Sequence, residues 1–247
     1  MFSTKNVPHS ASVPPIAGNI SDKIPSLPQV RLHPSLAERG IKVATAIVVV
    51  PSVSRNRGAA LKEYIEQSLR VLQVEDSLKT PIFEAYHELH VAAGFPDAVA
   101  PAQRLLQLVQ RTGNLPTINR IVDTYNIASV ETLISIGAHD LSQIQGDIRF
   151  DWTTGKESYW ALGEEASVVL PAYEYACLDN EKVLCRLDIR QCHETLVNKD
   201  TRYIFLYTQG NRLTSQQEVD DALEHTLTLL KQFCEADLLQ LHPRFLV

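Results

Sequence analysis

Residues 114–150 constrain the fold more than any other stretch, because polar residues interrupt an apolar pattern there at regular intervals. Gly113 stands where a helix C-cap belongs and Pro116 follows it, so one helix is expected to end before this stretch. Residues with a helical spacing of three or four come next and predict a helix with one buried face. They are Ile118, Ile121, Val122, Tyr125 and Ser129.

Asp123 and Asn126 lie one turn apart on this predicted helix, although both residue types favour local hydrogen bonds over helix interiors. A short apolar run, 134–138, follows and leads into His139 and Asp140. Gly146 and the residue after it indicate a turn, and residues 148–150 alternate like a strand.

The flanking segments separate into a helical part and a later β-rich part. The β-branched run 41–50 predicts a buried strand, and three helices are expected over 59–72, from Thr80 to Gly94 and over 100–111. On the second of these helices, Phe83, Tyr86, His87 and His90 are expected to share one side. The later part predicts hairpins at 152–160 and 173–187, strands at 168–170 and 202–208, and a last helix capped by Thr214 or Ser215 and ending near Cys234.

This order of elements predicts an α+β fold, with a β-sheet or sandwich core partly covered by helices. Residues 1–36 carry six of the 13 prolines, so we expect a poorly ordered N-terminal extension there and one domain over residues 37–247.

The composition limits the classes of function. A net charge of −6 gives no global positive field for nucleic acid, although a local patch remains compatible with it. No apolar run is long enough to cross a membrane, and no secretory signal stands at the N-terminus, so a cytoplasmic protein is expected. Four widely spaced cysteines without a CxxC pair predict reduced thiols.

The familiar catalytic motifs give little support to other enzyme classes. His87 and His90 are three residues apart, not four as in the HExxH zinc motif, so a partly buried helix face is the simpler interpretation. Cys185, Cys192 and His193 form no fixed metal-binding spacing. The chain has neither a GxSxG elbow nor a P-loop. We therefore expect no metal and no cofactor.

The ordered polar residues of 114–150 resemble the editing (B3/B4 tRNA-binding) domain of the phenylalanyl-tRNA synthetase beta subunit, in the form of a free-standing member. The family pattern runs Asn-x-x-x-Asp-x-x-Asn, then Ala-x-Asp-Leu, then Gly-Asp before a strand. Here it falls on Asn119, Asp123, Asn126, Ala138, Asp140, Leu141, Gly146 and Asp147. A weaker likeness continues through Arg186, 190–195 and 200–201, so the resemblance covers about residues 80–210.

The resemblance implies that this domain holds the aminoacylated 3′ end of tRNA and hydrolyses a mischarged amino acid from it. Asn126 would position the water or the carbonyl, and Asp123 or His139 would orient its amide. Gly137 stands where the synthetase domains commonly have histidine, and His139 replaces their phenylalanine. The residues expected to contact the substrate are Tyr125, Gly137, Ala138, Asp140, Arg186, Arg190, His193 and Glu194.

The roles of the two arginines and the absence of a strong base each have a chemical reason. Arg186 and Arg190 are candidates for phosphate or carboxylate contacts because guanidinium groups bind such anions through two parallel hydrogen bonds. An activated ester needs only to be held beside an oriented water, so a strong general base is not required.

The alternative is a catalytically silent module of the same fold that binds RNA or a small amino-acid-like ligand. A third alternative is an unrelated small-molecule enzyme that reuses the pocket. The oligomeric state does not follow from the sequence.

Overall fold

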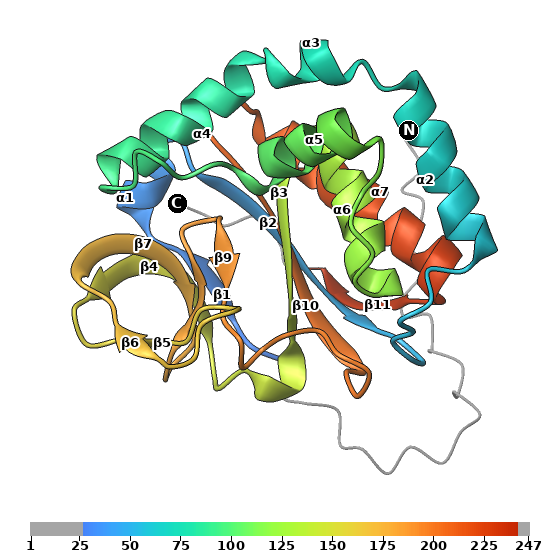
Figure 1. Cartoon of the computed structure of the whole chain (residues 1–247). Helices are drawn as coiled ribbons and strands as arrows, with labels where there is room; N and C mark the ends of the chain where they lie inside the picture. The colour runs from blue at the N-terminus through green and yellow to red at the C-terminus, as the bar shows by residue number, and fades with distance from the viewer. Residues whose placement is uncertain (1–26, 242–247) are drawn as a thin grey trace, which may run out of the picture.

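The computed structural model describes residues 27–241. The protein is an α+β fold in which a four-stranded sheet, ordered β11-β2-β10-β3, lies between a layer of helices and a five-stranded sheet, ordered β1-β4-β7-β8-β9 (Figure 1). The first half of the chain contains β1 Val30–Leu32, α1 Pro34–Glu38, β2 Lys42–Val49, α2 Ala59–Val71, α3 Val74–Leu78, α4 Pro81–Ala92, α5 Pro101–Thr112, α6 Arg120–Thr132, β3 Ser135–Asp140 and the short 3₁₀ turn η1 Leu141–Gln143. The second half contains β4 Ile148–Thr154, β5 Ser158–Tyr159, β6 Val168–Val169, β7 Ala172–Leu178, β8 Val183–Arg186, β9 Arg190–Gln191, β10 Tyr203–Gly210, α7 Gln216–Cys234 and β11 Asp237–Leu241.

The strands β2, β10 and β3 of the four-stranded sheet are buried on both faces because their side chains alternate between two cores, one with the helices and one with the five-stranded sheet. On β10, Ile204 and Leu206 pack with the helices, whereas Phe205 and Tyr207 pack with the five-stranded sheet. The apolar run predicted at 41–50 forms β2, which pairs antiparallel with β10 along its whole length. A strand buried on both faces explains why the run is continuously apolar rather than alternating.

Two helix ends follow the expected signals, and the start of α6 differs from the expected one. Gly113 ends α5 in the left-handed conformation at φ +71°. Ser215 begins α7 with a capping box, in which Ser215 and Glu218 satisfy each other's backbone N–H groups. Asn119 caps α6, because its side-chain oxygen accepts the N–H of Val122 at 2.9 Å. Ile118 therefore precedes the helix and is 54% exposed, contrary to its predicted place on the buried face.

Three other local expectations need correction. Residues 30–36 of the expected extension contribute to β1 and to the start of α1, and β1 pairs in parallel with β4. The 152–160 segment turns at Gly155, but its arms do not pair with each other, because β4 pairs with β7 and β5 pairs with β6. His87 is exposed, and only Phe83, Tyr86 and His90 of the predicted face are buried. Residues 1–26 of the expected extension lie outside the described residues.

Gly137 is required by close packing inside the second core, which lies between the four-stranded and the five-stranded sheet. It pairs with Tyr207 across β3 and β10, and a Cβ added at Gly137 would lie 2.3 Å from the Tyr207 ring carbon Cζ and from its hydroxyl oxygen. Tyr207 is itself 2% exposed, so its ring has little room to move. The aromatic ring therefore occupies the space that a side chain at position 137 would need.

Gly137→Ala is expected to destabilise the protein by about 1–3 kcal/mol, because overpacking a well-filled core has costs of that size. Urea unfolding of the wild type and of the variant measures this difference. The matched experiment repeats the substitution in a Tyr207→Ala background, where the same methyl group should cost much less. An equal cost in both backgrounds would show that Tyr207 is not the obstacle.

Candidate functional site

The predicted site helix α6 lies where the outermost strands of the two sheets approach each other. β3 ends the four-stranded sheet and β9 ends the five-stranded sheet. The amide nitrogen of Asn119 donates to the carbonyl of Val197 at 3.1 Å, which fixes the start of α6 to the connection between β9 and β10. Tyr125 reaches further, because its buried hydroxyl interacts with Gln191 on β9. Burial raises the pKa of Tyr125, so its phenol stays neutral.

Asn126 differs from its polar neighbours on α6. It is 9% exposed, and its side-chain amide makes no hydrogen bond to any residue in the 27–241 range. Neither polar atom of this amide is fully enclosed, so both retain contact with solvent. A nearly buried amide with free donors and a free acceptor can bind a ligand or a water molecule.

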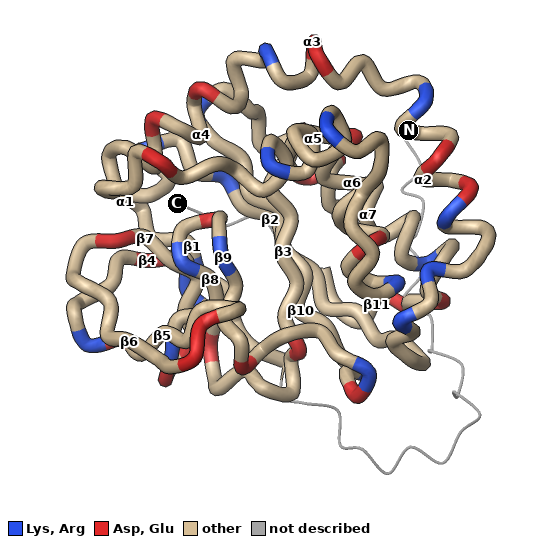
Figure 2. The backbone as a smooth tube through the Cα atoms, viewed as in Figure 1, with Lys and Arg blue, Asp and Glu red and all other residues tan. Residues whose placement is uncertain are grey.

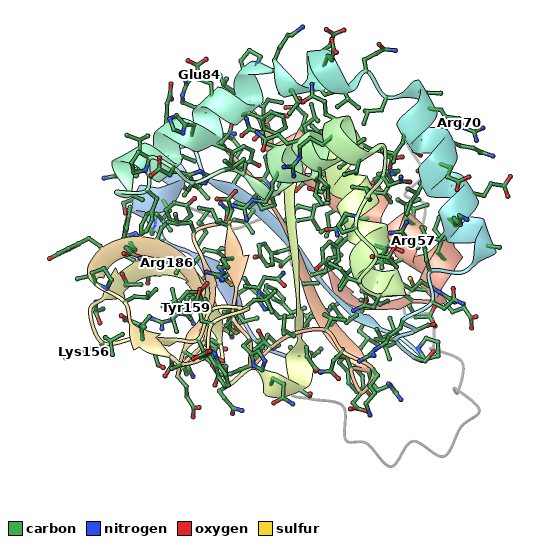
Figure 3. All side chains as sticks on the ribbon, in the orientation of Figure 1. Arg57, Arg70, Glu84, Lys156, Tyr159 and Arg186 are labelled. Atoms are coloured by element: carbon green, nitrogen blue, oxygen red, sulfur yellow. The ribbon has the colours of Figure 1, made fainter. Side chains whose placement is uncertain are left out.

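Asp123 is occupied by contacts that hold α6 in place. One carboxylate oxygen accepts from Arg57 Nε at 2.9 Å, and the other accepts the backbone N–H of Ile118 at 2.9 Å. Arg57 also donates to the carbonyl of Pro116 at 2.6 Å. Asp123 is fully buried, and neither oxygen contacts Asn126. Figure 3 shows Arg57 on the helical side of the molecule.

His139 lies on the other face of the central sheet from α6. Its ring stacks on Tyr207 at 5.8 Å between centroids, and its Nδ1 is 2.7 Å from the hydroxyl of Thr195. Burial lowers the pKa of His139 to about 3, so the imidazole is neutral at physiological pH. Because it is fully enclosed and faces the second core, it does not come together with Asn126.

Ala138 and Asp140 serve packing and capping. Ala138 is fully buried in the helical core. One oxygen of Asp140 accepts from the N–H and hydroxyl of Ser142, and the other accepts from the hydroxyl of Thr201 at 2.7 Å. These contacts begin η1 and fix the start of β10, so both carboxylate oxygens of Asp140 are already used.

A cavity of about 920 Å³ brings Arg186 and Arg190 together. Its walls come from residues 94–98 after α4, from the β5–β6 segment between Tyr159 and Val168, and from residues 186–190. Arg186 makes two parallel hydrogen bonds to Glu174, at 2.7 and 2.8 Å, and its guanidinium lies 4.3 Å from the ring centre of Phe95. Figure 3 shows Arg186 and Tyr159 on the side of the five-stranded sheet.

His193 and Glu194 lie outside this cavity. His193 is exposed and stacks on Trp160 at 4.4 Å between ring centroids. Glu194 is exposed, and none of its side-chain atoms bonds a residue of the described part of the chain. The predicted substrate-binding residues therefore divide into the α6 surface, the buried β3 strand, the cavity and an exposed loop.

A buried ionic network next to the cavity-lining residues was missed by sequence reasoning. Asp188, between the cavity-lining residues Leu187 and Ile189, accepts from Ser135 Oγ at 2.8 Å and is 2.6 Å from His90 Nε2. The sequence pattern places His90 only on a helix face, and its partner Asp188 is 98 residues away. The sequence shows only an acidic residue between two apolar ones, Leu187 and Ile189, and this pattern does not identify a partner.

The two pKa shifts in this network support an ion pair. Burial lowers the pKa of His90, but the hydrogen bond and charge of Asp188 outweigh it, and the net pKa lies above the usual value. Burial raises the pKa of Asp188, but His90 and Ser135 outweigh it, and the net pKa lies below the usual value. Between pH 3.8 and pH 6.5, the ordinary pKa values of the two groups, His90 is therefore protonated and Asp188 is ionised.

The four cysteines are free and buried. Burial raises the pKa of Cys185 to about 12 and that of Cys234 to about 11, so these thiols stay protonated. Within residues 27–241 no three histidine, cysteine or acidic side chains are arranged to hold a metal ion. No helix in the same range is long and apolar enough to span a bilayer.

Fold and site together define an α+β domain with a two-sheet core, a solvent-accessible amide on α6 and a separate ligand-sized cavity. A family model for the B3/4 domain matches residues 95–235, and the chain belongs to this family. Among solved structures, the chain is similar to an N-terminal fragment of the phenylalanyl-tRNA synthetase beta-subunit from Pyrococcus horikoshii, with 15% identity and a TM-score of 0.49. That match covers 87% of this chain and 51% of the synthetase fragment, so this chain spans about half its length. The comparison with curated proteins found no match.

Asp188→Asn is expected to lower the free energy of unfolding by about 3–5 kcal/mol near pH 5, because it leaves a buried His90 without its counter-charge. His90, with a raised pKa, contributes stability below its ordinary value of 6.5 and loses that contribution as pH rises through the raised pKa. Asp188, with a lowered pKa, contributes above 3.8 and loses its contribution as pH falls further.

Urea unfolding at about pH 5 and at about pH 9 measures the effect, and the loss should be smaller at the higher pH. Glu88→Gln is the control, because Glu88 also pairs with a cation, accepting two hydrogen bonds from Arg212, but on the surface. It should change stability little at either pH. A loss for Asp188→Asn that is the same at both pH values would contradict an ion pair.

Proposed function

We propose that this B3/4 domain binds the aminoacylated 3′ end of tRNA and hydrolyses mischarged aminoacyl-tRNA in trans, with a tyrosyl ester on the phenylalanine tRNA as the first substrate to test. The observation that carries this proposal is Asn126. It is the one residue of the expected catalytic set whose polar atoms are both free of hydrogen bonds and in contact with solvent, within the described chain.

The chemistry requires little more than orientation. An aminoacyl ester is already activated, so holding its carbonyl beside a water molecule supplies much of the rate. The Asn126 amide has donors for the carbonyl oxygen and an acceptor for a water proton. Asp123 supports the site indirectly by fixing the residues before α6 through Arg57 and Ile118. His139 contributes to packing as a neutral ring.

RNA would reach this surface without help from the overall charge. Figure 2 shows lysine and arginine interspersed with acidic residues over the helices and the five-stranded sheet, whereas β2, β3 and β10 carry little charge. Binding would therefore rest on a few contacts near α6. The affinity for RNA should still fall with added salt, whereas affinity for a small neutral or zwitterionic ligand should not.

A second candidate function is a catalytically silent binding module of the same fold. The observation that favours it is the loss of partners for Asn126: Asp123 bonds Arg57, and His139 faces the other core. Tyr207 also fills the space at Gly137, where the synthetase domains commonly have histidine. This alternative predicts binding without turnover.

Asn126→Ala is expected to reduce the rate of deacylation by a factor of at least about 100, because it removes the group that orients the reacting atoms. The measurement is release of labelled amino acid from a panel of mischarged tRNAs, starting with tyrosine on the phenylalanine tRNA. Asn114→Ala is the control, since Asn114 is an exposed asparagine after α5. It should retain the wild-type rate.

Circular dichroism and urea unfolding establish that both variants are folded. Turnover by the wild type that survives Asn126→Ala would remove Asn126 from the site. Absence of turnover on every tRNA, with salt-sensitive tRNA binding retained, would favour the silent module.

A further inference from the structure

The cavity beside β8 and β9 is separate from the α6 surface and has the features of a small-molecule site. Its volume of about 920 Å³ lies in the upper part of the range of about 300–1,000 Å³ typical of ligand pockets. Tyr159, Leu187 and Ile189 give it apolar walls, and the ring of Phe95 lies beneath the guanidinium of Arg186. Ligand pockets commonly combine such walls with a few convergent polar groups.

Both arginines are held in place but keep unused donors. Glu174 binds Nε and one terminal nitrogen of Arg186, which leaves Nη1 without a hydrogen-bond partner in the described chain. Arg190 donates from Nε to the carbonyl of Leu162, and its Nη1 lies 2.8 Å from Glu164. Its Nη2 has no hydrogen-bond partner among the described residues. Guanidinium groups fixed in this way are suited to a carboxylate.

The fixed charge of the walls is nevertheless negative. Asp97, Glu164 and Glu165 line the cavity together with the two arginines, and Glu174 lies behind Arg186. Asp97 and Glu165 are exposed and make no hydrogen bond or ion pair with another described residue. A phosphate or a simple carboxylate would meet net repulsion here. A ligand that also carries an ammonium group would satisfy both signs of charge.

We propose that this cavity binds a small zwitterion, with an apolar body joining one ammonium group and one carboxylate. Its carboxylate is bound by Arg186 and Arg190, its ammonium group by Asp97 or Glu165, and its apolar body by Phe95, Tyr159 and the adjoining aliphatic side chains. Free apolar amino acids and short apolar peptides share this chemistry. An aminoacyl ester does not, because its carboxyl group is esterified, so the site is independent of the proposed deacylation.

Isothermal titration calorimetry on the full chain tests the proposal with L-phenylalanine and L-alanyl-L-phenylalanine as the two zwitterions. L-phenylalaninamide lacks the carboxylate, and 3-phenylpropionate lacks the ammonium group. At least one zwitterion should bind about tenfold or more tightly than either of these analogues, since each charged hydrogen bond contributes on that scale. Tighter binding of L-phenylalanine would indicate an amino-acid site, and tighter binding of the dipeptide would indicate a peptide site.

Arg190→Gln should weaken zwitterion binding by about tenfold. Its side chain is 47% exposed, so folding should be preserved. Arg186→Lys is the second variant, because it keeps a cation for Glu174 while losing the paired donors. Arg212→Gln, at an exposed arginine outside the cavity, is the matched control and should bind as the wild type does. The proposal would be overturned if neither zwitterion binds, or if L-phenylalaninamide binds with equal affinity. It would also be overturned if inorganic phosphate binds more tightly, or if Arg190→Gln leaves the zwitterion affinity unchanged.

Discussion

The pairing of β10 with both β2 and β3 is the constraint on which the rest of the structure depends. This strand is buried on both faces, so its alternate side chains must fill two different cores. Its position fixes where the helices pack, where the five-stranded sheet lies and which residues of β3 face each core. His139 and Ala138 are neighbours in sequence, yet they belong to opposite sides of the molecule for this reason.

Local patterns predicted many of the elements of this fold. The continuous β-branched run predicted a buried strand, which β2 confirms, and the start of α7 was expected at Thr214 or Ser215, of which Ser215 is the cap. Strand partners were less accessible, because an alternating pattern shows that a segment is extended but not what it pairs with. The 152–160 segment illustrates this: it turns at Gly155 as a hairpin would, but its two arms pair with other strands.

The site was harder to predict for the same reason. The α6 helix and the polar residues on it were recognised from the sequence, but their surroundings depend on contacts far along the chain. The ion pair of Arg57 with Asp123 joins residues 66 positions apart, and that of His90 with Asp188 spans 98. A polar residue in an apolar pattern has the same appearance in sequence whether it binds a substrate or a buried counter-charge. Only the three-dimensional arrangement separates Asn126, whose amide is free, from Asp123, whose carboxylate is not.

The burial of all four cysteines has a practical consequence for studying this protein. Each thiol is enclosed, and burial raises its pKa, so alkylating reagents meet little reactive thiolate in the folded chain. A single cysteine introduced at an exposed position would then be the one accessible thiol, since no further cysteine occurs anywhere in the sequence. Fluorescent or spin labels could be attached at chosen points around α6 and the cavity without first removing the native cysteines.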